Sequence, residues 1–282
     1  MKRHTIAYVL LGVVVAAAVV AAVYVKLYSS GSLAAYDNVP VSAAQIRALE
    51  AIAGNYSLAA SVGRGIVGAP LTQAGGNGNN DGPFNLSASS QLVINGTPYV
   101  VYVGAEYCPY CAVTRWGLIL ALMRFGNFSS LHYMTSSATD AYPNTATFTL
   151  YNVSYSSRYI GFMEAETLTN KAPYKQLQAL NGMETSTFDA YNLYNNALPS
   201  QDRGGIPFID FGNYSAQVGA PVSPQVIQHM SWNKTISELY NPDSAPAQAI
   251  IGTANVYTAA ICKMTGNMPS SVCGRQFIRK LE

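Results

Sequence analysis

The sequence predicts an α/β fold, because a strand, a helix and a second strand follow one another in the middle of the chain. Tyr99–Val103 is a short run of β-branched and aromatic residues, which is typical of a buried strand. Ala112–Phe125 has the length and apolar composition of a helix, and Gly126 is a suitable C-cap. Leu131–Thr135 follows as the next predicted strand. Together these segments predict a βαβ unit.

Further elements flank this unit. Val41–Ala53 predicts a short helix with Ser42 as its N-cap. Asn95-Gly96 predicts a tight hairpin turn, because this dipeptide tolerates positive φ. The elements predicted after the unit are a strand over 206–211 opened by a proline, a hairpin partner over 213–218, and helices over 224–239 and 246–263.

The N-terminal segment predicts a membrane anchor. Ile6–Val25 is 20 residues without a charge, and as a helix it spans about 30 Å, the thickness of the bilayer hydrocarbon. Lys2 and Arg3 favour a cytoplasmic N-terminus, so the chain from about Leu27 onward is expected outside the cell. A cleaved signal peptide is the alternative, although its apolar region usually runs only about 7–15 residues.

This reasoning divides the chain into successive regions. The predicted regions are a cytoplasmic N-terminus (1–5), a transmembrane anchor (6–25), a lead-in ending in a Gly/Asn-rich loop (26–83), and the main α/β domain (84–282) with a large insertion at about 136–199. The insertion separates the βαβ unit from the proline-opened strand.

The composition argues against a nucleic-acid partner. Charged residues make up only 11% of the chain, with 16 basic against 14 acidic residues, whereas phosphate binding needs clustered Lys and Arg. Such a weakly charged surface predicts a folding stability that stays nearly flat between acidic and neutral pH, which would suit an acidic exterior.

Two further features agree with export. Asn-x-Ser/Thr sequons occur at Asn55, Asn85, Asn95, Asn127, Asn152, Asn213 and Asn233. They are either glycan acceptors of a glycoprotein or the by-product of a surface rich in Ser and Asn. The even number of cysteines, 4 in two local pairs, fits an oxidising compartment with disulfide bonds.

The first pair, Cys108-Pro109-Tyr110-Cys111, stands at the start of the predicted helix. A helix N-terminus stabilises a thiolate, which is the reactive form of cysteine. Cys108 is therefore the predicted nucleophile and Cys111 the resolving thiol, with Pro109 and Tyr110 forming the active-site turn. Glu106 just before them is either a proton acceptor or, as we expect, an exposed turn residue.

These residues resemble the thioredoxin superfamily. The resemblance rests on the strand, the Cys-Pro-Tyr-Cys motif at a helix start, and Ile206-Pro207 before a later strand. It implies a thioredoxin-like fold in which the Ile206–Pro207 peptide bond is cis and the Ile206 backbone faces Cys108 and contacts substrate. The long insertion and the absence of a Trp-Cys-Gly-Pro-Cys motif depart from thioredoxin itself.

The wider chain is similar to a family of membrane-anchored thioredoxin-like proteins from thermoacidophilic archaea that has no established activity. The matching segments are 108–111, 115–116, 124–127, 206–210 and the tail from Cys262 to Cys273.

The second pair has a different prediction. Cys262 and Cys273 enclose a compact loop after an apolar helix, which predicts a structural disulfide that fastens the C-terminal tail. A second redox pair that relays electrons to the first is the alternative. We expect no metal, because a structural zinc site needs four ligands and the histidines lack a suitable spacing.

The sequence thus predicts a membrane-anchored, extracytoplasmic thiol–disulfide oxidoreductase that needs no cofactor. Its expected partners are protein thiols and disulfides, membrane lipid around residues 6–25, and a redox partner in the membrane. Export favours the formation or reshuffling of disulfides, but the direction of the reaction stays open. The alternative is a non-catalytic, glycosylated cell-surface binding protein on the same scaffold.

Overall fold

The computed structural model describes residues 32–69, 81–88 and 90–282. The anchor predicted over 6–25 and most of the Gly/Asn-rich loop lie outside these ranges. Within them, no helix combines the length and apolar character needed to cross a membrane. The chain divides into two units, 1–35 and 36–282, and apart from one short helix at the boundary everything below concerns the second.

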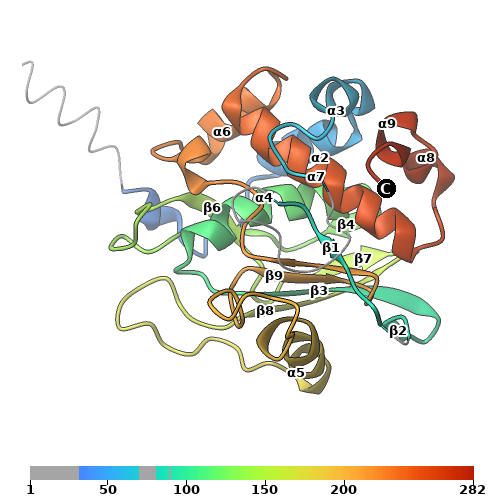
Figure 1. Ribbon diagram of the computed structural model, residues 1–282. Coiled ribbons are helices and arrows are strands. Elements are labelled where there is room, and N and C mark those ends of the chain that lie inside the picture. Colours follow the sequence, from blue (N-terminus) through green and yellow to red (C-terminus); the bar gives the residue numbers. More distant parts are fainter. Residues whose placement is uncertain (1–31, 70–80, 89) are drawn as a thin grey trace, which may run out of the picture. The chain divides into compact units, whose positions relative to one another are not determined.

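A mixed six-stranded sheet forms the centre of this unit (Figure 1). Its strands are β8 (Gly161–Glu166), β3 (Thr97–Gly104), β9 (Phe208–Phe211), β10 (Ser215–Val218), β1 (Phe84–Asn85) and β2 (Val93–Ile94). β3 pairs in parallel with β8 on one side and antiparallel with β9 on the other. β9 continues antiparallel to β10 and β10 to β1, while β2 forms a hairpin with the start of β3.

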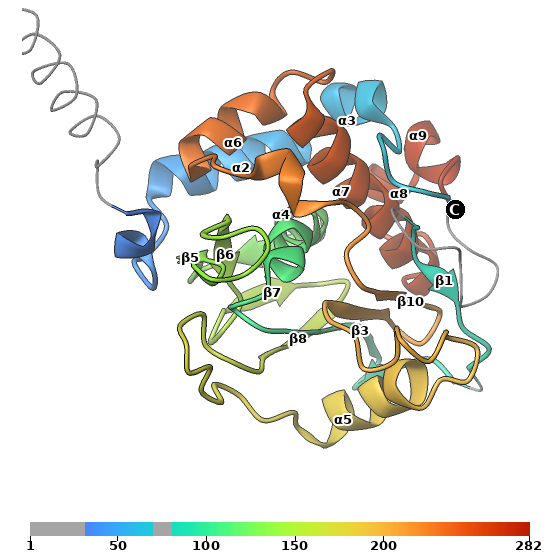
Figure 2. The same ribbon diagram turned by 60° about the vertical axis from the view of Figure 1, so that its left-hand side comes forward.

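Helices cover both faces of this sheet, as the two views show (Figures 1 and 2). α4 (Pro109–Met123) and α7 (Ala245–Met264) lie on one face, and α5 (Gly182–Phe188) with the π-helical turn η2 (Asp189–Leu193) lies on the other. The α5 face packs Val101, Val103 and Phe208 against Phe188. The result is a three-layer α/β/α arrangement, which confirms the predicted α/β class.

α4 and α7 cross closely. A Cβ added to Gly117 of α4 would come within 2.5 Å of Thr253 Cγ2 on α7, so the crossing requires glycine. Farther along, the buried Arg124 donates to Thr258 Oγ1 of α7 at 2.8 Å. The two longest described helices are thus fixed to each other at two points.

Smaller elements surround these layers. They are α2 (Ala43–Gly54), α3 (Tyr56–Val62), the β4–β7 pair (Gly126–Phe128, Tyr155–Ser157), the β5–β6 pair (His132–Thr135, Ala146–Thr149), η3 (Pro224–Ile227), α6 (Trp232–Leu239), α8 (Ser270–Cys273), α9 (Gln276–Arg279) and, where the two units join, η1 (Leu33–Tyr36). Ser42 caps α2 as predicted, and Ile94 pairs with Thr97 across the predicted Asn-Gly turn. The helix predicted over 224–239 is instead broken into η3 and α6, where His229 adopts a φ of 63°.

The predicted βαβ unit has the wrong second strand. Residues 132–135 form β5, which pairs antiparallel with β6 outside the main sheet, and the parallel partner of β3 is β8. β8 lies inside the region predicted as an insertion, so that region contributes a strand to the central sheet. The sequence does not identify β8 as the partner of β3, because Glu164 and Glu166 are unusual in a strand that helices cover.

Asparagine occupies most of the positions with positive φ that are not glycine. Seven non-glycine residues in the described ranges have positive φ, and apart from His229 they are Asn38, Asn95, Asn144, Asn152, Asn213 and Asn267. Asparagine is one of the few residues that tolerate this conformation. Part of the asparagine content therefore serves the turns.

Candidate functional site

The Cys-Pro-Tyr-Cys motif follows the loop that connects β3 to α4 and forms the first turn of α4. β3 ends at Gly104, and after a three-residue loop Cys108 becomes the N-cap of α4, with Pro109 in the first turn. The Sγ atom of Cys108 accepts a hydrogen bond from the backbone N–H of Cys111 at 3.3 Å. Sulfur thus occupies the capping position that an oxygen usually fills, as expected for a thiolate held by a helix N-terminus.

The two thiols differ in access and acidity. Both are free in the structure; Cys108 keeps 6% of its surface exposed, whereas Cys111 is 0% exposed. The hydrogen bond from the Cys111 side chain lowers the pKa of Cys108 and outweighs the opposing effect of burial. Burial raises the pKa of Cys111 well above its usual range. Cys108 is therefore the more accessible and more acidic thiol, which is the property of a nucleophile.

A buried ion pair lies beside this motif. Arg115 and Glu166 are both 0% exposed and form a two-pronged salt bridge, with Nε–Oε1 and Nη2–Oε2 distances of 2.7 Å. Arg115 Nε also donates to the Tyr102 hydroxyl at 3.1 Å. Burial lowers the pKa of Arg115, but the charges of Glu166, Tyr102 and Cys111 and the hydrogen bond to Glu166 together outweigh burial and hold that pKa well above its usual range. The guanidinium therefore stays charged.

Glu106 is not the exposed turn residue that we expected from the sequence. It is 4% exposed, and its Oε1 accepts a hydrogen bond from Thr149 Oγ1 at 2.7 Å. Burial raises its pKa to about 7. It lines a pocket of about 520 Å³ together with Lys171 and Lys175, which belong to the loop after β8. A carboxyl that titrates near neutral pH thus stands two residues before the nucleophile.

Tyrosines surround the motif. Tyr107 packs on Tyr174 at 4.7 Å between ring centroids, and Tyr110 meets Tyr142 edge-on at 5.9 Å. Tyr110 and Tyr174 remain exposed. These partners come from loops that the sequence placed in the insertion, so the insertion forms part of the rim of the site.

Ile206 and Pro207 lie at the same end of the sheet as the motif. The peptide bond between them is cis, as the resemblance implied. Pro207 immediately precedes β9, and the antiparallel register pairs Phe208 with Val103 near the end of β3. The loop from β3 to Cys108 and the segment from Pro207 into β9 therefore lie at the same end of the sheet.

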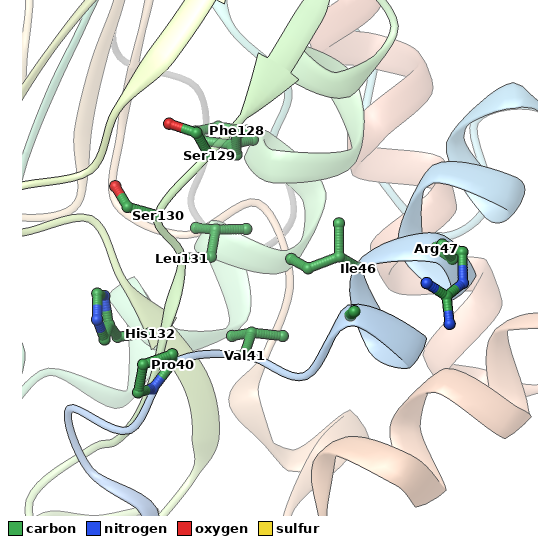
Figure 3. A pocket seen from close by; sticks show the side chains of 10 residues that line it. Pro40, Val41, Ile46, Arg47, Phe128, Ser129, Ser130, Leu131 and His132 are labelled. Atoms are coloured by element: carbon green, nitrogen blue, oxygen red, sulfur yellow. The ribbon is translucent and has the colours of Figure 1, made fainter.

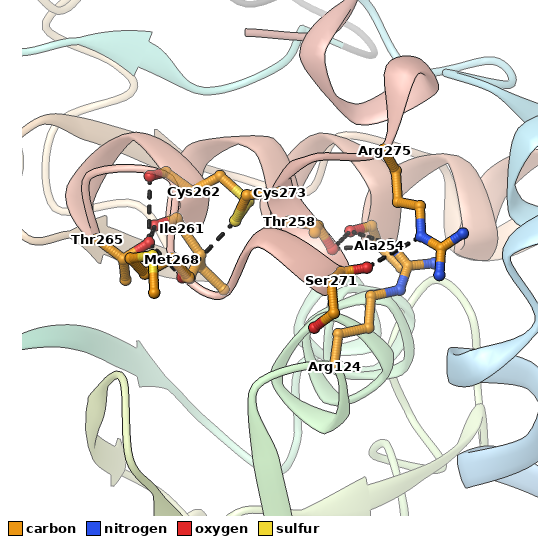
Figure 4. Close-up of a disulfide and its surroundings, with 10 residues drawn as sticks. All are labelled: Arg124, Ala254, Thr258, Ile261, Cys262, Thr265, Met268, Ser271, Cys273 and Arg275. Carbon is orange, nitrogen blue, oxygen red and sulfur yellow. Dashed lines mark hydrogen bonds between the residues drawn. A yellow bond between two sulfur atoms is a disulfide. The ribbon is translucent and has the colours of Figure 1, made fainter.

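The second cysteine pair forms a disulfide. Cys262 near the end of α7 is joined to Cys273 of α8, 11 residues later, and both are 0% exposed (Figure 4). The disulfide links the tail to the helix that packs on α4. This confirms the predicted pairing.

A second pocket is remote from the motif in the chain. It measures about 510 Å³ and lies between residues 40–47, which include the start of α2, and 128–132, which run from the end of β4 to the start of β5 (Figure 3). None of its lining residues belongs to either cysteine pair. In the described part of the chain, no group of three or more His, Cys, Asp or Glu side chains is placed to hold a metal ion.

Sequence reasoning missed Tyr102, Arg115 and Glu166. Arg115 carried a usable signal, since it is the one charged residue among the helical positions 109–123 and stands four residues after Cys111. Glu166 carried none, because its partner depends on a strand pairing between distant parts of the chain.

A comparison with protein families finds one match. The model of a family described as a domain of unknown function (DUF929) matches residues 84–263, which is more than half of the chain and includes the motif, Arg115, Glu166 and Pro207. No curated protein and no solved structure matches the chain.

Proposed function

Since the chain belongs to the DUF929 family of domains of unknown function, its activity has to be inferred from its own residues, and we propose that it is a membrane-anchored, extracytoplasmic thiol–disulfide oxidoreductase with a thioredoxin-like fold. One observation carries the proposal: Cys108 caps α4 through its sulfur and is the more acidic and more accessible of two thiols three residues apart. A purely structural pair would gain nothing from this asymmetry.

The arrangement of elements supports the thioredoxin-like fold. β3, α4 and β8 form a parallel strand–helix–strand unit, and the β9–β10 hairpin follows antiparallel to it. α4 and α7 cover one face and α5 the other, with a cis-proline at the start of β9. This order and these layers are similar to those of the thioredoxin superfamily, to which the motif also points.

The proposed reaction is a two-step exchange. The Cys108 thiolate attacks a sulfur of the substrate disulfide; the substrate S–S bond breaks, a mixed disulfide with Cys108 forms, and one substrate sulfur leaves as a thiolate. The sulfur of Cys111 then attacks Cys108, releasing the second substrate sulfur. The protein is oxidised to a Cys108–Cys111 disulfide and the substrate is reduced to two thiols. The reverse sequence forms a substrate disulfide.

The location is part of the proposal and rests on the sequence. The uncharged segment 6–25 supports a single membrane anchor, and the basic residues before it support an extracytoplasmic main domain. A protein in the membrane that reoxidises or reduces Cys108 and Cys111 would complete the cycle.

A trapping experiment tests the activity. The full-length Cys111→Ser variant is incubated with a peptide that contains a disulfide, because without the resolving thiol the mixed disulfide accumulates. We expect an adduct at Cys108 by mass spectrometry, and no adduct in the matched Cys108→Ser variant. Absence of an adduct at Cys108 would refute the enzyme proposal.

The second candidate is a glycosylated cell-surface binding protein without turnover. It is favoured by the sequon asparagines, six of which are exposed; the exception, Asn213, is half-buried and donates to the carbonyl of Ser90 at 3.1 Å. Failure of the trapping experiment, with glycans found at the exposed sequons, would support this candidate.

A further inference from the structure

A buried cation lies one helical turn below the second cysteine of the motif. Cys111 and Arg115 stand four residues apart on α4, so their side chains share one face of the helix on adjacent turns. Arg115 Nη2 donates at 2.7 Å to the carbonyl of Ala105, in the loop that leads into Cys108. The guanidinium therefore reaches back along α4 toward the end that carries the two sulfurs.

One donor atom of this guanidinium is unused. Nε and Nη2 bond to Tyr102, Ala105 and Glu166, whereas Nη1 is buried and has no hydrogen-bond partner within the described residues. A buried donor without a partner is unfavourable, so an orphaned N–H beside reactive groups calls for an explanation. A sulfur that becomes negatively charged supplies one, because a charged acceptor forms a stronger hydrogen bond than a neutral one.

Few other ionisable groups face the two sulfurs. Tyr102 of β3 and Glu166 of β8 bond to Arg115 itself. The remaining groups are Glu106 and Tyr107 in the loop before the motif and Tyr110 within it. Among the other elements packed on α4, β6 and η3 contain no ionisable side chain, and Arg47 and Glu50 of α2 are exposed. On α7, Tyr257 packs against Phe211, at the other end of β9 from Pro207. The positive charge of Arg115 acts to lower the pKa of both thiols.

We propose that Arg115, oriented by Glu166, stabilises negative charge on the Cys111 sulfur and thereby sets the balance between the dithiol and disulfide forms of the motif. The inference rests on the proposed function. In the resolving step Cys111 gives up its proton, its sulfur bonds to Cys108, and the departing substrate thiolate takes up the proton. Arg115 favours the charged sulfur before this bond forms and again when the bond is broken by reduction.

The test separates the charge of Arg115 from its structural contribution. In the full-length protein, Glu166→Gln keeps the guanidinium but removes its counter-charge, and the double variant Arg115→Met/Glu166→Gln removes both charges. For each folded variant, the pH dependence of Cys108 alkylation gives the pKa of the Cys108 thiol. Equilibration with reduced and oxidised glutathione gives the equilibrium constant between the dithiol and the disulfide form of Cys108 and Cys111.

The two variants should move in opposite directions. Glu166→Gln should raise the fraction of Cys108 in the thiolate form at pH 7 about tenfold over wild type, and it should shift the dithiol–disulfide equilibrium of the motif toward the dithiol. The double variant should lower the thiolate fraction about tenfold and shift the equilibrium toward the disulfide. If Arg115 and Glu166 were merely structural, both variants would have a lower melting temperature, while the Cys108 pKa and the dithiol–disulfide equilibrium constant would both stay at the wild-type values. That result would overturn the proposal.

Arg115→Lys covers the case in which the double variant does not fold. It retains the positive charge next to Glu166 but loses the second donor arm, so the thiolate fraction should fall several-fold. Unchanged alkylation and equilibrium in this variant would equally overturn the proposal. These readouts need no protein substrate. If the variants shift in opposite directions but no peptide is trapped, only the proposed function is refuted. If a peptide is trapped but neither readout shifts, only the role of Arg115 is refuted.

Discussion

The two cysteine pairs lie on helices that pack against each other, yet their surroundings are opposite. Cys108 and Cys111 stand at the beginning of α4, next to a buried ion pair, and are free. Cys262 lies near the end of α7 and forms a disulfide with Cys273 in the C-terminal tail, and both residues are fully buried. A helix N-terminus favours a thiolate and a helix C-terminus does not. Position on the helix and access to the sulfur, rather than the number of cysteines, therefore separate a reactive pair from a structural one.

The largest expected effect is on exchange activity. Cys108→Ser should reduce the rate of exchange with a disulfide peptide by about 10³-fold or more, because the attacking sulfur is lost. The double variant Cys262→Ala/Cys273→Ala should stay within about twofold of wild type at a temperature where it is folded. Comparable losses in both variants, measured as initial rates, would mean that the second pair also takes part in the reaction.

The same double variant should lose stability. The disulfide closes a loop over a separation of 11 residues, and the chain-entropy model assigns such a loop about 3 kcal/mol. Unfolding in guanidinium chloride measures the change, with Cys108→Ser as the control that keeps the disulfide. A change below about 0.5 kcal/mol would show that the tail is held by packing alone.

Acidity should strengthen the fold. Burial raises the pKa of Glu106 to about 7, of Glu164 to about 8 and of Asp210 to about 7. Groups whose folded pKa is raised stabilise fully below their unfolded pKa, near 4, and lose this contribution as the pH rises toward 8. The free energy of unfolding should therefore be larger at pH 4 than at pH 8, by on the order of 3 kcal/mol.

This replaces the flat profile expected from the low charge alone. Asp210→Asn, which leaves all four cysteines in place and can still accept the N–H of Asn213, should reduce the slope of the free energy of unfolding between pH 4 and pH 8. Chemical unfolding at several pH values measures it. Acid unfolding of the wild type above pH 4 would contradict the raised pKa values.

A smaller effect is expected where the two helices meet. Gly117→Ala brings a methyl group to 2.5 Å from Thr253 Cγ2, and Thr253 is held by its own hydrogen bond to Ala249. Overpacking of this kind costs about 1–3 kcal/mol. Gly182→Ala is the matched control, since nothing lies within 4 Å of the added Cβ. Cys108 alkylation should be unchanged in both, and a stable Gly117→Ala variant would mean that the helices can separate without cost.

The reactive pair could be predicted further from the sequence than its surroundings. The motif at a helix start, the cis bond before Pro207 and the Cys262–Cys273 disulfide follow from local spacing or from resemblance, and the structure contains all three. The partner of β3 could not be predicted, because several short strands follow α4 before β8 and strand pairing is a non-local choice. Glu166 depended on that choice, and the burial of Glu106 depended on the loops that fold over it.

The left-handed turns have a consequence of their own. Aspartate and asparagine both suit this conformation, yet none of the described residues that adopt it is an aspartate. An amide has no proton to gain or lose between acid and neutral conditions, so at the six asparagine turns the residue with positive φ keeps the same charge at every pH in that range; among the described non-glycine residues with positive φ, His229 is the exception. At these six turns the chain thus avoids an ionisable side chain at the residue that adopts the left-handed conformation.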